Sequence, residues 1–102
     1  MAQEWDRVAY ISAVDELAGE RRSVSEFRQW RGHVESYRDA AYYEEGKSGS
    51  DGDWWSSADE AIAWARERAD IVFVRIGNTH YSAGALHAED DEHQPLPLWP
   101  PT

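Results

Sequence analysis

Hydrophobic side chains between residues 24 and 41 recur at spacings of three and four, which is the period of one helix face. The apolar positions are Phe27, Trp30, Val34, Tyr37 and Ala41. Ser23 and Glu26 have the spacing of a capping box at the start of this stripe. Gly32 falls on the opposite, polar side, where it marks a bend or a close approach. We predict a helix over residues 24–41.

A second helix is predicted over residues 58–69. Ser57 and Glu60 form another capping box. Trp64 and Arg68 are one turn apart, where a guanidinium can stack on the indole. The apolar stripe is mostly alanine, which indicates close packing, and consists of Ala58, Ala61, Ile62, Ala65 and Ala69.

Residues 71–76 are β-branched or aromatic except for one arginine, and the run is too short for a helix, so we predict a buried strand. Gly77-Asn78 follows and suits a type II′ turn, which predicts a returning strand over residues 79–86. The register expected for this hairpin places Val74 opposite Tyr81, Val72 opposite Ala83, and Arg75 opposite His80.

Two short segments fit more than one element. Residues 7–14 carry apolar side chains at intervals of three that spread around a helix, and β-forming residues on both faces favour a central strand instead. Tyr42 and Tyr43 either continue the first helix or form a short strand.

The fold predicted is therefore a small α+β domain of order β-α-α-β-β. Its mostly antiparallel sheet of three or more strands would pack against two helices.

The compact domain is expected to span residues 1–86, and residues 87–102 form an acidic, proline-rich tail. Four prolines exclude regular helix or central strand in this tail and favour extended structure. Leu96, Leu98 and Trp99 favour docking of the tail on the domain over docking on a partner.

The net charge of the chain and its distribution exclude some classes of function. The formal net charge of −10 argues against direct nucleic-acid binding, which relies on lysine and arginine. Residues 39–64 carry a net −6, whereas residues 21–38 carry a net +3. There is no cysteine, and no signal or membrane-spanning stretch is visible, so we expect a cytoplasmic protein without a membrane partner. Arginine exceeds lysine, which hints at a GC-rich bacterial genome.

A glycine-, serine- and aspartate-rich loop between the predicted helices ends in Trp54-Trp55. Two adjacent side chains of an extended segment point to opposite sides, so we expect one of these indoles to face a partner. The residues predicted to bind that partner are Trp54, Trp55, Asp51, Asp53 and Trp99.

A second hypothesis places a small-ligand pocket between the sheet and the first helix. Its aromatic lining would consist of Trp30, Tyr37, Tyr42, Tyr43 and Tyr81, which an ordinary core would use equally well. No spacing of histidine and carboxylate residues matches a defined metal site, and no nucleophile–base pair or phosphate loop stands out. We therefore expect no metal or other cofactor and no catalytic residue.

The leading functional hypothesis is a non-catalytic protein-interaction module, comparable to antitoxins, immunity proteins and small inhibitors. Its acidic stretch would steer it onto a basic protein surface. Opposite patches on one molecule could also pair two copies as a homo-oligomer. The alternatives are a small-ligand-binding protein or small enzyme, and a DNA mimic that displays carboxylates at phosphate spacing.

Overall fold

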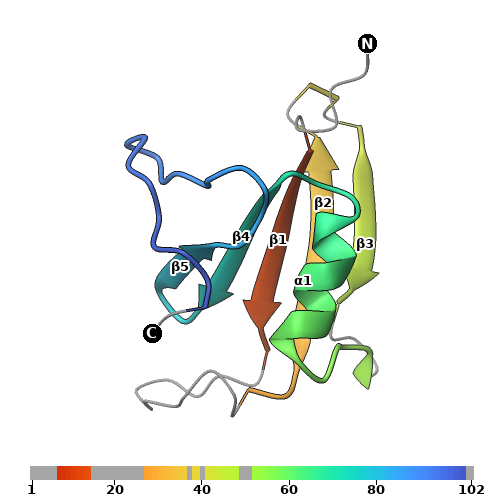
Figure 1. Cartoon of the computed structure of the whole chain (residues 1–102). Coiled ribbons are helices and arrows are strands. Elements are labelled where there is room, and N and C mark those ends of the chain that lie inside the picture. The colour runs from red at the N-terminus through yellow and green to blue at the C-terminus, as the bar shows by residue number, and fades with distance from the viewer. Residues whose placement is uncertain (1–6, 15–26, 37, 40, 49–51, 101–102) are drawn as a thin grey trace.

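The computed structural model describes residues 7–14, 27–36, 38–39, 41–48 and 52–100. A five-stranded sheet of order β3-β2-β1-β4-β5 carries one helix on one of its faces (Figure 1). The elements are β1 (Arg7–Ala13), β2 (Trp30–Ser36), β3 (Tyr43–Lys47), α1 (Ala58–Arg66), β4 (Ile71–Ile76) and β5 (Thr79–Ser82).

The sheet is mixed. The central strand β1 pairs antiparallel with β2 and parallel with β4, and the outer pairs β2–β3 and β4–β5 are antiparallel. A parallel pair needs a long crossover, which the chain provides by passing through β2, β3 and α1 before β4. The small α+β domain is confirmed, but the predicted pair of helices and the predicted strand directions are not.

The helix predicted over residues 24–41 is wrong where the structure describes it. Trp30, Gly32 and Val34 are buried, whereas Arg31 and Glu35 are exposed, so the burial alternates with the period of a strand. A spacing of four brings Trp30 and Val34 to one side in a strand as well as in a helix, which made the pattern ambiguous. The predicted capping box lies outside the described residues.

Gly32 marks a close approach between strands, as one of the two sequence interpretations held. A β-carbon at this position would collide with Cδ1 of Ile11 on the neighbouring strand β1 and would lie 3.1 Å from the carbonyl oxygen of Tyr10. The absence of a side chain therefore lets β1 and β2 pair closely at the centre of the sheet.

The predictions for the second half of the chain are largely confirmed. The helix begins after Ser57, whose side chain accepts from the amide of Glu60, but it ends at Arg66 and not at the predicted residue 69. The alanines of its predicted stripe are buried. β4 has the predicted bounds, and Gly77 has a φ of 60°, as a type II′ turn requires at its first position. Tyr81 lies opposite Val74, although β5 ends at Ser82 and not at residue 86.

The main core lies between the sheet and α1. The fully buried members of this layer include Ala9, Ile11, Trp30, Val34, Ala61, Ala65, Val72 and Val74. Trp30 is the largest of them and donates a hydrogen bond from its indole to the carbonyl of Phe27 at 3.0 Å. Small alanines on α1 let the helix approach the sheet closely.

The last part of the chain passes around the β5 edge. Ser82 donates its amide to the Pro97 carbonyl at 2.8 Å, and Trp99 donates to the Ser82 carbonyl at 2.8 Å. The Trp99 ring then packs edge-on against Trp30 and Tyr81, with ring centroids 5.9 and 5.4 Å apart. The proposed boundary between a domain of residues 1–86 and a tail stays a prediction.

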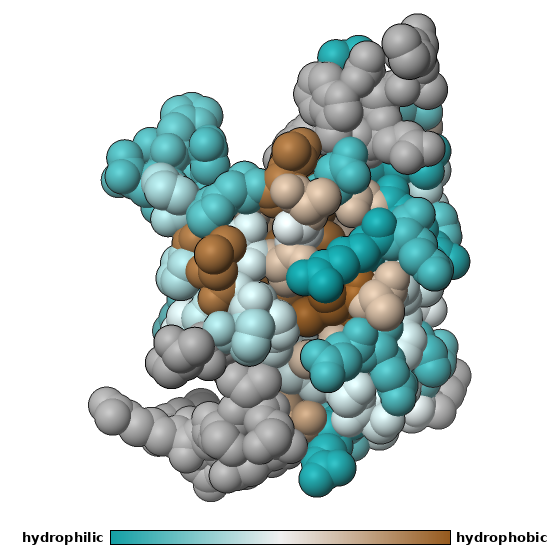
Figure 2. All heavy atoms as spheres, viewed as in Figure 1, coloured by the Kyte–Doolittle hydropathy of each residue, from teal (hydrophilic) through white to brown (hydrophobic). Residues whose placement is uncertain are grey.

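Seen from the helix side, apolar surface forms separate small areas between hydrophilic side chains (Figure 2). Within the described residues, no helix has both the length and the apolar character needed to cross a membrane.

Candidate binding site on the open face of the sheet

The sheet face opposite α1, which we call the open face, carries a row of aromatic rings across four strands. Tyr43 on β3 stacks on His33 of β2 with ring centroids 5.2 Å apart. His33 stacks on Tyr10 of β1 at 5.1 Å, and Tyr10 stacks on Phe73 of β4 at 5.3 Å. The Tyr10 and Phe73 planes are nearly parallel, at 6° to one another.

Strand register explains why the rings align. His33 lies opposite Tyr10, and Tyr10 lies opposite Phe73, so these three occupy one cross-strand line. Tyr43 pairs with Glu35, two residues from His33, and reaches the row diagonally. Among the elements that the structure describes, the only helix lies on the other face, and Tyr43 keeps 56 % of its surface exposed.

Three hollows on the open face share Tyr10, with volumes of about 620, 310 and 270 Å³. The largest lies toward the C-terminal segment, and we call it the trough. Its lining consists of Tyr10, Ile71, Phe73, Leu86, His87, Glu89, Asp90, Asp91 and His93. Aromatic and aliphatic side chains thus meet three successive carboxylates, and none of the lining residues is a lysine or an arginine.

The carboxylates are held by a small C-terminal hairpin, residues 88–96. Leu96 donates its amide to the Ala88 carbonyl at 3.0 Å, and Asp90 donates to the Gln94 carbonyl at 2.9 Å. Oδ1 of Asp90 accepts the amides of Glu92 and Gln94, each at 2.9 Å, which fixes the turn. The hairpin is anchored to the sheet where the amide of Ala88 donates to Oγ of Ser82 at 2.8 Å.

The carboxylates of the trough, Glu89, Asp90 and Asp91, also line the neighbouring hollow. Among the described residues, no lysine or arginine forms an ion pair with Glu89, Asp90 or Asp91, and His93 approaches Glu89 at 3.6 Å. Arg75 and His80 line the adjacent 310 Å³ hollow. In the described part of the chain, no group of three or more histidine, aspartate or glutamate side chains is placed so that it could hold a metal ion.

Trp54 and Trp55 differ in burial. Trp55 retains 8 % exposure, exchanges two backbone hydrogen bonds with Trp30 at 2.8 and 2.9 Å, and packs on Trp64 with centroids 5.2 Å apart. Trp54 is half-buried and Asp53 is exposed, whereas Asp51 lies outside the described residues. Trp55 is therefore part of the core.

The five aromatic residues of the predicted pocket do not line one cavity. Trp30 is fully buried on the helix face and Tyr81 lies on the same side, while Tyr43 belongs to the open face. Tyr42 packs under the guanidinium of Arg7 at 4.4 Å, and Tyr37 lies outside the described residues. The first helix that would have walled this pocket is replaced by β2 over residues 30–36.

Sequence reasoning did not select Tyr10, His33 and Phe73. β1 was interpreted as covered on both faces, which makes Tyr10 an ordinary core residue, and His33 was placed on a helix. The signal available was one aromatic residue near the centre of each of two strands, which a parallel pairing brings side by side.

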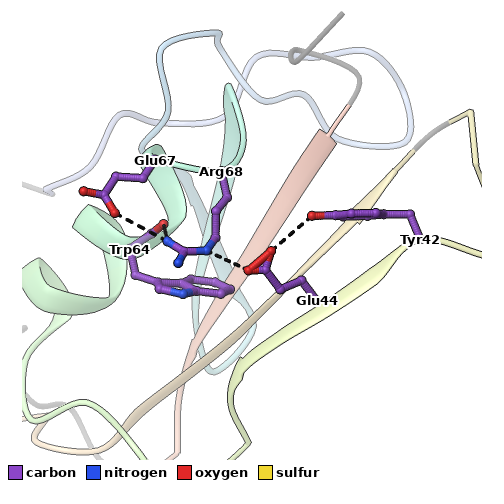
Figure 3. A network of polar contacts seen from close by, with 5 residues as sticks. All are labelled: Tyr42, Glu44, Trp64, Glu67 and Arg68. Carbon is purple, nitrogen blue, oxygen red and sulfur yellow. Dashed lines mark hydrogen bonds and ion pairs between the residues drawn. The ribbon is translucent and has the colours of Figure 1, made fainter. Parts of the chain in front are cut away.

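A polar network ties α1 to β3 on the helix face (Figure 3). Arg68 donates from Nε to Oε2 of Glu44 at 2.8 Å and lies over the Trp64 ring at 4.7 Å, which confirms the predicted stacking. The Tyr42 hydroxyl donates to Oε1 of Glu44 at 3.2 Å. The hydrogen bond from Arg68 is the main cause of a lowered Glu44 pKa, whereas burial and the bond to Glu44 raise the pKa of Tyr42.

No protein-family model matches the chain, and comparisons with curated proteins and with solved structures found no similar protein. What the protein binds must therefore be inferred from its own residues.

Proposed function

We propose that this protein is a non-catalytic interaction module that binds a basic segment of a partner protein in the trough. The observation that supports this most directly is the composition of the trough. Tyr10 and Phe73 meet Glu89, Asp90 and Asp91 there, without a lysine or arginine in the lining. Aromatic rings and carboxylates both attract organic cations, so the two kinds of side chain favour the same occupant.

The extent of the open face favours an extended segment over a compact ligand. Tyr10 lines the trough and both smaller hollows, so concave surface continues on either side of it. The ring row crosses four of the five strands. A protein segment laid along this row would place one basic side chain in the trough and further residues on the neighbouring rings.

Net charge supports the same class of partner. At −10, the chain attracts a basic partner and repels nucleic acid. This charge would accelerate encounter, whereas the trough would provide the specific contact.

The test measures binding of a fluorescently labelled peptide of alternating arginine and glycine by anisotropy at low salt. We expect Asp91→Asn to weaken binding by about threefold, the effect of one partly exposed ion pair. Glu92→Gln is the matched control, because Glu92 lies on the same hairpin outside the lining, and this variant should bind like the wild type. Amide chemical shifts should change around Tyr10 and Phe73.

Three results would contradict the proposal. One is the absence of binding to the arginine peptide at low salt. Another is equal weakening by Asp91→Asn and Glu92→Gln, which would mean diffuse attraction by the acidic chain. The third is tighter binding of a labelled oligothymidylate than of the peptide, which would indicate a nucleic-acid partner.

A further inference from the structure

The trough combines an apolar surface with a carboxylate surface, and the apolar surface interacts differently with lysine and with arginine. Phe73, Ile71 and Leu86 supply apolar surface, and Glu89, Asp90 and Asp91 supply acceptors. An ammonium is a compact, strongly hydrated charge that loses water when it approaches apolar side chains. A guanidinium is flat and weakly hydrated, so it packs against rings while its five N–H groups reach acceptors.

The carboxylates are arranged to offer several acceptors together. They occupy three successive positions of one hairpin, and the turn is fixed because Oδ1 of Asp90 accepts two backbone amides. Asp91 has no ion-pair partner among the described residues. The planar fork of a guanidinium donates two parallel N–H bonds to carboxylate oxygens, whereas an ammonium acts as a compact charge without that bidentate geometry.

Two basic residues of the molecule each lie near a ring and a carboxylate. Arg68 lies 4.7 Å from the Trp64 ring centroid and 2.8 Å from a Glu44 oxygen. Lys47 has an equivalent pair of neighbours, yet its Nζ lies 5.7 Å from the Trp55 ring and 3.8 Å from an Asp53 oxygen. Arg68 thus shows a guanidinium held between a ring and a carboxylate, which is the combination that the trough offers.

We infer that the trough selects arginine over lysine in the basic segment of its partner. This inference rests on the proposed function, since it specifies which side chain the trough takes. Phe73 is a specificity-determining residue, because its ring provides the surface that discriminates between the two cations. The hairpin carboxylates attract arginine and lysine alike.

The experiment compares three labelled peptides that alternate glycine with arginine, lysine or citrulline, the last being a neutral isostere of arginine. We expect the arginine peptide to bind about tenfold more tightly than the lysine peptide, and the citrulline peptide to bind more weakly than either. Phe73→Leu should reduce the arginine-to-lysine ratio toward one, and Glu92→Gln should leave it unchanged. The circular dichroism spectrum of Phe73→Leu establishes that it is folded.

The outcomes separate the inference from the proposed function. If the arginine and lysine peptides bind equally to the wild type, selectivity is absent and only the inference fails. If neither binds, the proposed function fails as well. If citrulline binds as tightly as arginine, charge is not recognised, and both are wrong. Because the wild-type ratio needs no variant, the inference stays testable even if Phe73→Leu does not fold.

Discussion

At the scale of single residues, Glu44 does more than pair with one arginine. It accepts from Arg68 on the helical side and from Tyr42 on its own side, so one carboxylate connects the end of α1 to the edge strand β3. The side chains of Arg68 and Glu44 are 30 % and 40 % exposed, and water screens their attraction. The network therefore positions the end of α1 against β3 and contributes only modestly to the free energy of unfolding.

The lowered pKa of Glu44 fixes the direction of its pH effect. A carboxyl that binds its proton less tightly in the folded state stabilises the fold above its ordinary pKa of 4.5, and this contribution is lost as pH falls below that value. We expect Glu44→Gln to lose about 1 kcal/mol or less at neutral pH and to be nearly equal to the wild type in acid. Urea unfolding across this pH range measures the difference. A constant difference at all pH values would contradict the assignment to Glu44.

At Gly84 an added β-carbon would meet backbone atoms. A β-carbon there would collide with the Asp70 carbonyl oxygen and would lie 2.8 Å from the Val72 amide nitrogen. Both neighbours are backbone atoms, so no side chain can move aside. We expect Gly84→Ala to lower the free energy of unfolding by about 3 kcal/mol, measured in urea. Ala85→Ser at the exposed neighbouring position is the control, and an equally small effect of both would refute the close contact.

At the scale of elements, residues 97–99 cover one edge of the sheet through a single β-bridge between Leu98 and Ser82. Their backbone pairs with Ser82, and the Trp99 ring fills the space between Trp30 and Tyr81. On the opposite edge, no described residue pairs with the outer side of β3. That strand has only five residues and carries Glu44, Glu45 and Lys47, features that discourage edge-to-edge association.

Removing the Trp99 ring should destabilise the fold. Trp99 is half-buried, so we expect Trp99→Ala to cost about 2 kcal/mol, less than the loss of a fully buried tryptophan. Leu98→Ala removes a neighbouring side chain that is 65 % exposed and should change stability by less than about 0.5 kcal/mol. Urea midpoints of both variants test this, and equal effects would mean that the ring does not pack on Trp30.

At the scale of the whole molecule, sequence patterns predicted the half of the fold that depends on neighbours in the chain. The capping box at Ser57 and the turn at Gly77 are local signals, and both were interpreted correctly. β2 was missed because its burial depends on pairing with β1, and the spacing of Trp30 and Val34 fits either period. The candidate site was missed for a related reason, since its rings meet only after the strands have paired.

The path of the C-terminal segment links the two sides of this protein. Ala88 is attached to Ser82 on the open face, and eleven residues later Trp99 packs on the helix face beside Trp30. One continuous segment therefore forms the wall of the proposed site and also part of the cover of the core. By thermodynamic linkage, a partner that holds the hairpin in place must also raise the resistance of the distant tryptophan core to unfolding. Conversely, a change at Trp99 that also loosens the hairpin would weaken binding of that partner.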